Sequence, residues 1–488
     1  MRRVLGFTSI EYSLMHSLLE LLTHRILIES LLIGVMMVKS SAILLFIGVS
    51  IALVTTGRAG EPIKSNDIFP YPVAKTVLDN GLTVLTISYD SPGLVAYYTV
   101  VRTGSRNEVE AGHSGFAHFF EHCMFRGTVK YPADKYNDIL KRLGADSNAF
   151  TTDDWTCYHV VASSDALETI ADIESDRFMN LKYSEESFKT EAGAILGEYN
   201  KNYSVPFQSM YEELQNSSFT THTYKHTTMG FLADIKDMPN QYEYSLKFFD
   251  RFYRPENCTV IVVGDVKNDD VIRIVKKYYS GWQKGTYQVH VPAEPPQKEE
   301  KVVHMPWKNR TLPYLLVGYH VPAFSDADVE RASLDILSQL VFSESSPLYQ
   351  SLVIKKQLVE FVSGGSDDHR DAFLFTVMSR IKDAKNIDSV RDEIYAALEN
   401  AKTVPVDAKK LEDIKSHVRY AFAMQLNNPD NVAVTAASYI ALTGNYESMN
   451  KIYALYDKVT AGDIMHAAQK YFTKENRTVV ILEHEAAQ

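Results

Sequence analysis

Hydrophobic and polar positions follow two patterns along residues 70–290. Short apolar runs bounded by turn residues predict strands, whereas apolar residues three or four positions apart predict helices. Asp79-Asn80-Gly81 separates the runs Val73–Leu78 and Leu82–Ser88, and Asn-Gly between two such runs predicts a hairpin. Leu94–Arg102 predicts a third strand.

The first helical pattern begins at Ser114, which we expect to cap it, and ends near Arg126, where Gly127 stops it. The rest of this region predicts helices over Asp134–Leu143, Asp165–Leu181 and Glu185–Tyr203, and strands over Ser147–Thr151, Trp155–Ala162 and Asn257–Val263. Residues 289–301 are rich in proline and charge, which is typical of a linker.

Beyond this linker the order of elements repeats coarsely. The pattern predicts strands over Tyr314–His320, Phe361–Gly364, Phe373–Ile381 and Thr478–Glu483, and helices over Asp328–Val341, Asn386–Ala401, Ala408–Leu426 and Ala461–Tyr471. We therefore expect an α+β fold with two halves of about 200 residues each. The expected domains are residues 61–288 and 302–488.

The segment before residue 61 has the pattern of a secretory signal peptide. Lys39 precedes Ala42–Val54, a run of 13 apolar or small residues, and Gly57-Arg58-Ala59 resembles a cleavage site. The run is short for a transmembrane helix, which needs about 20 residues, although an uncleaved anchor remains the alternative. Residues 1–36 precede a complete signal, so we expect the true start at Met36 or Met37. The mature chain is then exported, to the periplasm in a Gram-negative host.

Composition excludes some classes of protein. The chain has 488 residues, 45% of them apolar, and a formal charge of −11. Nucleic-acid binding is disfavoured, because it needs clustered Lys and Arg. The three cysteines form no CxxC pair, so we expect them to be buried as small hydrophobic side chains.

The segment Gly115–Thr128 contains the motif His118-x-x-Glu121-His122. The two histidines are four residues apart, so they share one face of a helix and can reach one ion. Zinc lowers the pKa of a water molecule towards about 7, and Glu121 beside it could take the proton. This order of residues is the inverted zincin motif.

A catalytic zinc usually needs a third protein ligand. Glu191 and Glu198 are seven residues apart and share a face of the helix predicted over Glu185–Tyr203. One of them could bind the metal while the other orients a ligand. The spacing alone does not decide which.

Together with these residues, several short motifs identify a resemblance. They are Asn80-Gly81-Leu82, Gly104-Ser105, Phe125-Arg126-Gly127-Thr128, Asn148-Ala149 with Thr151, and Tyr253-Arg254-Pro255-Glu256-Asn257. Residues 70–488 resemble the pitrilysin/insulysin metallopeptidases, which include the mitochondrial processing peptidase. In that family the glutamate ligand follows the second histidine by about 76 residues, and here that position is Glu198.

The resemblance implies two homologous halves, each an antiparallel-rich sheet packed with helices, joined by a linker as a clam-shell. It implies one Zn²⁺ per chain held by His118, His122 and Glu198, with Glu121 as general base and Glu191 as the acidic residue seven before the ligand. It also implies that Ser147, Asn148, Ala149, Phe150 and Thr151 form an edge strand to which a peptide substrate adds by backbone hydrogen bonds. The sequence alone, without the resemblance, favours an ordinary core strand for this segment.

One departure concerns the second half. Active members of the family carry an Arg and a Tyr, seven apart, that help to stabilise the oxyanion, but these positions fall on Val353 and Glu360 here. Valine has no donor and glutamate would repel a developing oxyanion. We therefore expect a heterodimer with a pitrilysin-like chain that supplies the Arg/Tyr pair. The alternative is an enzyme that works alone with other residues.

The sequence thus predicts an exported zinc metalloendopeptidase that hydrolyses peptides or unfolded segments. The main alternative is a non-catalytic, pitrilysin-like assembly or binding subunit, against which the intact motif and Glu198 argue. A third reading, a membrane-anchored subunit, differs only in retaining the N-terminal segment.

Overall fold

The computed structural model describes residues 67–485, which form two sheets with their helices. The targeting segment expected over residues 1–60 lies outside the described residues. The strands are β1 (Val73–Val77), β2 (Thr83–Ser88), β3 (Leu94–Val101), β4 (Asp146–Thr151), β5 (Thr156–Ser163), β6 (Cys258–Gly264), β7 (Lys301–Trp307), β8 (Tyr314–Val321), β9 (Val359–Gly365), β10 (Phe373–Ile381) and β11 (Arg477–His484).

We call β1 to α9 the first half and β7 to β11 the second half. The helices of the first half are α2 (Phe116–Cys123), α3 (Ala133–Leu143), α4 (Leu167–Asn180), α5 (Glu185–Asn202), α6 (Pro206–Ser218), α7 (Leu232–Asp237), α8 (Tyr242–Phe252) and α9 (Asn268–Tyr279). Those of the second half are α10 (Glu330–Phe342), α11 (Pro347–Tyr349), α12 (Ile387–Thr403), α13 (Ala408–Gln425), α14 (Pro429–Thr443), α15 (Ser448–Lys458) and α16 (Ala461–Tyr471).

The two sheets are mixed but mainly antiparallel. The first has the order β1-β2-β6-β3-β5-β4, with only β2 and β6 parallel, and the second has the order β7-β11-β8-β10-β9, with only β7 and β11 parallel. The hairpin predicted around Asn80-Gly81 is confirmed by the antiparallel pairing of β1 with β2. Two halves of sheet and helix confirm the predicted α+β fold class.

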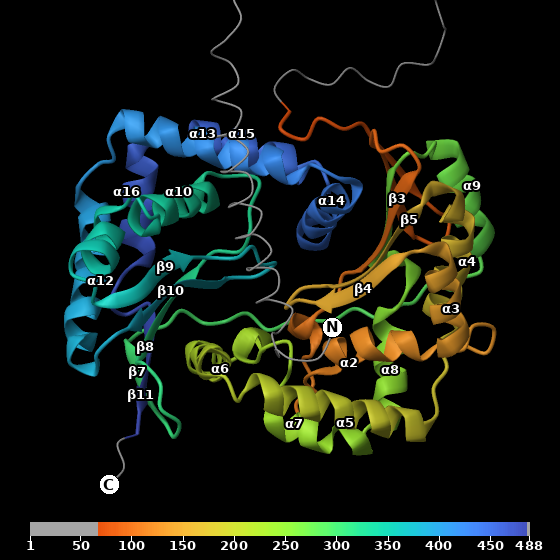
Figure 1. Ribbon diagram of the computed structural model, residues 1–488, viewed down its shortest axis with the longest axis horizontal. Helices are drawn as coiled ribbons and strands as arrows, with labels where there is room; N and C mark the ends of the chain where they lie inside the picture. The colour runs from red at the N-terminus through yellow and green to blue at the C-terminus, as the bar shows by residue number, and fades with distance from the viewer. Residues whose placement is uncertain (1–66, 486–488) are drawn as a thin grey trace, which may run out of the picture. The chain divides into compact units, whose positions relative to one another are not determined.

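One helix of each half packs against the sheet of the other half (Figure 1). Alternate side chains of β3 face opposite ways, so that Tyr98 and Val100 pack against α14 of the second half, while Tyr97 packs against the helices of the first. In return, α6 of the first half covers one face of the second sheet through Met210 and Leu214. This exchange of helices joins the two halves into one packed unit.

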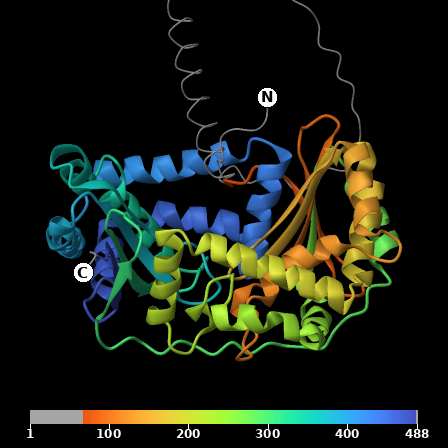
Figure 2. The same cartoon turned by 60° about the horizontal axis from the view of Figure 1, so that its bottom comes forward.

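The stretch between α9 and β7 contains no helix or strand over residues 281–300. Figure 2 shows it as the green trace that runs between the two halves. Glu294 within it accepts hydrogen bonds from the backbone N–H groups of Thr220, Thr221 and His222, at 2.7 to 2.8 Å. The stretch is therefore tied to the first half rather than free in solution.

Most of the elements predicted from sequence are present within a few residues of their expected bounds, but the cap on α2 is a correction. The α-helix starts at Phe116 with Gly115 as its N-cap, and its last turn, Met124–Arg126, is a 3₁₀ helix. Ser114 makes no capping hydrogen bond to α2; its hydroxyl donates instead to Asp234 at 2.6 Å. The three cysteines are buried and free, as expected.

No helix within residues 67–485 combines the length and the apolar character that a membrane span requires.

The exchanged helix makes a testable prediction. Replacing Ile440 of α14, 1% exposed against the first sheet, by Ala should lower the free energy of unfolding by about 2–4 kcal/mol, because the truncation leaves a cavity between the halves. Met424→Ala on α13, at a side chain 55% exposed, is the control and should change it by less than about 0.5 kcal/mol. Denaturant titration measures both. Equal small losses would show that α14 does not hold the halves together.

Candidate metal centre and active site

Helix α2 carries the two histidines inside an apolar environment. Phe116, Phe119 and Phe120 are almost wholly buried in the core of the first half, and His118 is only 7% exposed. Tyr158 of β5 donates a hydrogen bond to the backbone oxygen of Phe120 at 3.0 Å. A helix held in this way cannot turn without breaking the core, so the direction of its polar side chains is fixed.

The N-terminus of α2 is capped from a distance. The carboxylate of Glu108 accepts hydrogen bonds from the N–H groups of Gly115 and Ala117, both at 2.7 Å. Burial raises the pKa of Glu108 to about 8. Gly115 has a φ of +89°, and a Cβ there would lie 2.4 Å from Cδ1 of Ile235, so only glycine fits this start of the helix.

Helix α5 brings the third candidate ligand to α2. Oε2 of Glu198 lies 3.4 Å from Nε2 of His122 and 3.9 Å from Nε2 of His118. Among the described residues, His118, Glu121 and His122 also form a group whose potential ligand atoms lie within 4.8 Å of one another. Three nitrogen and oxygen donors on two packed helices therefore face one small volume.

Glu191 has a different position from Glu198. Its Oε1 lies 3.0 Å from Nδ1 of His122, the ring nitrogen that does not face Glu198, and its other oxygen pairs with Arg126. This contact fixes the plane of the His122 ring and would keep Nδ1 as its protonated nitrogen when Nε2 binds a metal. The structure thus separates the two glutamates, placing Glu198 with the histidine Nε2 atoms and Glu191 behind them.

The electrostatics of the two histidines differ. Burial and the nearby His122 lower the pKa of His118 to about 4, so His118 is neutral at neutral pH. Glu191 and Glu198 raise the pKa of His122 to about 9. Burial raises the pKa of Glu191, but His122 and Arg126 outweigh it and hold that pKa below its usual range. A metal bound here would take the place of the proton on His122.

Glu121 is a residue of α2 and lies next to the end of strand β4. Burial raises its pKa, and contact with Thr151, the last residue of β4, partly opposes the rise. Among residues 67–485, strand β4 is at the edge of the first sheet and pairs only with β5, which confirms the edge position expected for Ser147–Thr151. The candidate base and an open strand edge are therefore neighbours.

A cavity of about 540 Å³ connects these groups. His118, Glu121 and Glu198 line it, together with Phe150 and Thr151 of the edge strand. The second half contributes Asp367, Asp368 and His369 to its wall. The sequence did not predict this contribution, because these residues belong to no motif. The fold of the second half brings them to the site.

Other groups that sequence reasoning passed over support the site. Arg126 sits in the Phe-Arg-Gly-Thr motif but was given no role, and Glu108 lies in a loop with no pattern of its own. The histidine pair His222 and His226 forms no second metal cluster among the described residues. Nε2 of His222 lies 2.9 Å from Asp371, and Nε2 of His226 lies 3.8 Å from Glu108.

The second half offers no Arg/Tyr pair at the two expected positions. Val353 packs against the second core from a π-helical turn, Gln350–Lys355. Glu360 is exposed on β9 and pairs with Arg380 of β10 at 2.8 Å. Neither side chain can donate to an oxyanion.

Two family models match the chain in tandem. Insulinase (peptidase family M16) matches residues 84–231, which include His118, Glu121, His122 and Glu198, and the peptidase M16 inactive domain matches residues 241–418. The chain belongs to the M16 family of peptidases. The resemblance to the pitrilysin/insulysin family is thereby confirmed.

Relatives match along most of this M16 chain. It is 28% identical to the zinc protease PqqE of Helicobacter pylori over 443 residues, 89% of this chain and 97% of that protein. It is 21% identical to the "Probable mitochondrial-processing peptidase subunit beta" of Schizosaccharomyces pombe, over 81% of this chain and 88% of that one. These names support peptidase chemistry with zinc for the family to which the chain belongs.

Solved structures agree on the fold. A protease from Helicobacter pylori superimposes with a TM-score of 0.79 at 27% identity, over 85% of this chain and all of that one. The peptidase M16 inactive domain from Pseudomonas fluorescens has a TM-score of 0.76 at 15% identity, over 86% of this chain and 99% of that one. The similarity to the Pseudomonas fluorescens structure concerns the fold alone.

The distant cap on α2 can be tested. Glu108→Ala should lower the free energy of unfolding by about 1–3 kcal/mol, because two buried N–H groups lose their acceptor. Glu108→Gln should cost less, since its amide oxygen still accepts. Glu110→Ala, which removes a partly exposed ion pair with Arg251, is the control and should cost at most about 1 kcal/mol. Thermal or urea unfolding measures all three, and equal effects of the two Ala substitutions would contradict the capping role.

Proposed function

We propose that this M16 chain is a zinc-dependent endopeptidase. The observation that carries the proposal is the convergence of His118, His122 and Glu198 from two packed helices, with Glu121 beside them at an open strand edge. A purely structural helix would gain nothing from two histidines and a glutamate among buried phenylalanines, since buried polar groups cost free energy unless they are paired. The names of the relatives support the same activity.

The residues present fit a zinc ion. Two imidazoles and one carboxylate are a donor set that catalytic zinc sites use, with one position left for water or substrate. Oε2 of Glu198 already lies within 3.9 Å of Nε2 of each histidine. Glu191 and Arg126 hold His122 from the other side of its ring, as carboxylates that orient zinc-binding histidines do. We therefore assign one zinc per chain to His118, His122 and Glu198.

In the proposed mechanism the zinc ligands and Glu121 have separate tasks. When bound, zinc supplies Lewis-acid chemistry, lowering the pKa of water and polarising a carbonyl oxygen. Glu121 accepts the proton of the attacking water and then passes it to the leaving amine. Its raised pKa suits this double role, because the carboxyl must both accept and release a proton. The carboxyl lies next to Thr151, the last residue of the edge strand.

We propose that the substrate is an extended peptide that adds to β4. The backbone groups of Ser147, Asn148, Ala149, Phe150 and Thr151 on the edge away from β5 have no partner strand in the described sheet. An extended peptide there would gain main-chain hydrogen bonds that do not depend on its sequence. Its scissile bond would lie near Glu121, which meets the last residue of the strand.

We also propose that the mature enzyme is exported and works with a partner. The pattern of residues 37–60 supports export, and cleavage after it would release residues 61–488. The partner would be a similar M16 chain that carries the Arg/Tyr pair, because Val353 and Glu360 cannot donate to the oxyanion. Glu121, His118, His122 and Glu198 would then act from this chain.

The role of Glu121 makes the first prediction. Glu121→Gln should lower kcat for peptide cleavage by about 10²–10⁴-fold, because the amide cannot accept the proton of the attacking water. Zinc content should stay unchanged, because Glu121 is not one of the three proposed zinc ligands. Glu186→Gln, an exposed residue of α5, is the control and should behave like wild type. Steady-state kinetics with elemental analysis measures both properties. Normal activity of Glu121→Gln would remove it as the general base.

The role of Glu191 makes the second prediction. Glu191→Gln should weaken zinc binding about 10–100-fold, since the uncharged amide holds His122 less firmly. Competition with a chelator of known affinity measures this, and circular dichroism checks that the fold is kept. Unchanged zinc affinity would show that Glu191 does not act on the ligand.

The partner makes the third prediction. The mature chain alone should cleave peptides about 10²-fold or more slowly than the same chain co-purified with a second M16 chain that carries the Arg/Tyr pair. Arg→Ala in that partner should remove the gain. Full activity of the isolated chain would contradict the heterodimer. A chain without zinc and without activity in either state would favour the non-catalytic subunit.

A further inference from the structure

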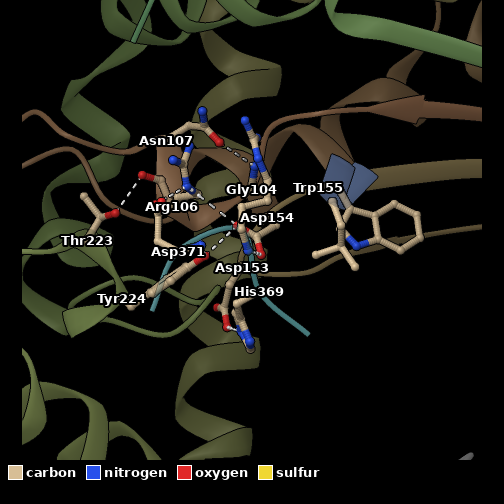
Figure 3. A network of polar contacts seen from close by, with 12 residues as sticks. Gly104, Arg106, Asn107, Asp153, Asp154, Trp155, Thr223, Tyr224, His369 and Asp371 are labelled. Atoms are coloured by element: carbon tan, nitrogen blue, oxygen red, sulfur yellow. Dashed lines mark hydrogen bonds and ion pairs between the residues drawn. The ribbon is translucent and has the colours of Figure 1, made fainter. Parts of the chain in front are cut away.

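A loop of the second half, residues 366–371, is packed against the turn that follows the edge strand in the first half (Figure 3). The loop connects β9 to β10, and the turn, Thr152–Trp155, connects β4 to β5. The two segments are more than 200 residues apart in the sequence. Charged and polar groups take part in their contact.

Three consecutive residues of the loop contact the first half, the first two of them at the turn. Nε2 of His369 lies 3.0 Å from Oδ2 of Asp153, and the backbone N–H of Arg370 donates to Oδ2 of Asp154 at 2.9 Å. Asp371 accepts from Nε of Arg106 at 2.5 Å and lies 2.9 Å from Nε2 of His222.

Two of these groups, His369 and Asp154, are sheltered from water, whereas the side chain of Asp371 is 34% exposed. His369 is 7% exposed and Asp154 is 3% exposed, and Tyr224 donates to the same Asp154 at 2.7 Å. Buried charges that lose a partner destabilise a protein by several kcal/mol, so such a contact holds its two segments in one arrangement. Exposed ion pairs would not have this effect.

The turn itself is tightly packed from the other side. A Cβ on Gly104 would lie 2.3 Å from the backbone oxygen of Thr152, so the turn touches the backbone before α2 directly. Ser105 donates to Oδ1 of Asp153 at 3.1 Å, and the N–H of Arg106 donates to its backbone oxygen at 2.7 Å. The turn is thus gripped between the first half and the loop of the second.

The gripped turn starts one residue after Thr151, where β4 meets Glu121. The same cavity is lined by the turn, by Glu121 and by His369. We propose that His369 and Asp371 are positioning residues, which act through Asp153, Asp154 and Arg106 to hold the peptide-binding edge of β4 in register with Glu121. On this view the second half, which carries no zinc ligand, helps to build the active site. The inference rests on the proposed peptidase function.

The first test separates binding from turnover in the zinc-loaded full chain with its partner. His369→Ala should raise KM about tenfold and lower kcat less than threefold, because the edge strand loses its register while the catalytic groups stay in place. His369→Gln should restore KM to within about twofold, since its Nε2 can still donate to Asp153. A merely structural role would lower the active fraction, and with it the apparent kcat, without raising KM.

His320→Ala is the matched control. His320 of β8 also joins the halves, with its Nε2 3.1 Å from the backbone oxygen of Ser218, but it touches neither the turn nor the cavity. It should leave KM unchanged. The double variant Asp153→Ala/His369→Ala should raise KM no more than the larger single effect, because the two residues act through one contact.

The second test does not depend on catalysis. In the Glu121→Gln background, hydrogen exchange of the amides in residues 146–155 should be at least about tenfold faster with His369→Ala than without it, and unchanged with His320→Ala. Unchanged KM, or unchanged exchange in this segment, would overturn the inference. If the wild-type chain cleaves no peptide, the proposed function fails, whereas the exchange result still shows whether the loop positions β4.

Discussion

The burial of α2 is the constraint on which the rest of the site depends. In a helix packed on most sides by phenylalanine, each polar group left unpaired in the core costs free energy. Its N–H groups are satisfied by Glu108 and His122 by Glu191, which in turn pairs with Arg126. The arrangement that satisfies these groups also leaves the two Nε2 atoms and Glu198 facing one another.

The same constraint explains why the chain needs both halves. The sheet that supports α2 has a second apolar face, and α14 of the second half covers it. With the halves joined in this way, the loop at residues 366–371 reaches the turn beside the edge strand. Residues of the second half therefore line part of the candidate active site. They are placed there by packing on one face of the first sheet and by polar contacts at its edge. The metal ligands come from one half, but the cavity does not.

Local patterns in the sequence predicted what depends on nearby residues. The hairpin at Asn80-Gly81, the strand at residues 147–151 and the helices that carry the histidines and Glu198 follow from turn chemistry and periodicity. The ligand spacing followed from family resemblance. The cap on α2 was assigned to Ser114 because a serine stood at the expected position, whereas the acceptor is Glu108, brought there by the fold. Side chains of this kind carry no local signal.

Contacts between the halves were the least predictable part. Helix α14 is rich in alanine and buried along most of its length, so its sequence does not say which sheet it covers. His369 and Asp371 lie in a loop without a motif, and nothing in the sequence around His222 indicates that it meets this loop. Only the fold shows that His222 and Asp371 come from opposite halves and meet at 2.9 Å.

The central claim is that α2 and α5 together form a zinc site. Anomalous diffraction at the zinc absorption edge, from crystals of the chain purified without chelator, tests it most directly. We predict one strong peak per chain between Nε2 of His118, Nε2 of His122 and the carboxylate of Glu198, with no peak in crystals of His122→Ala. Absence of a peak from wild-type crystals grown with added zinc, or a peak bound by other residues, would contradict the claim.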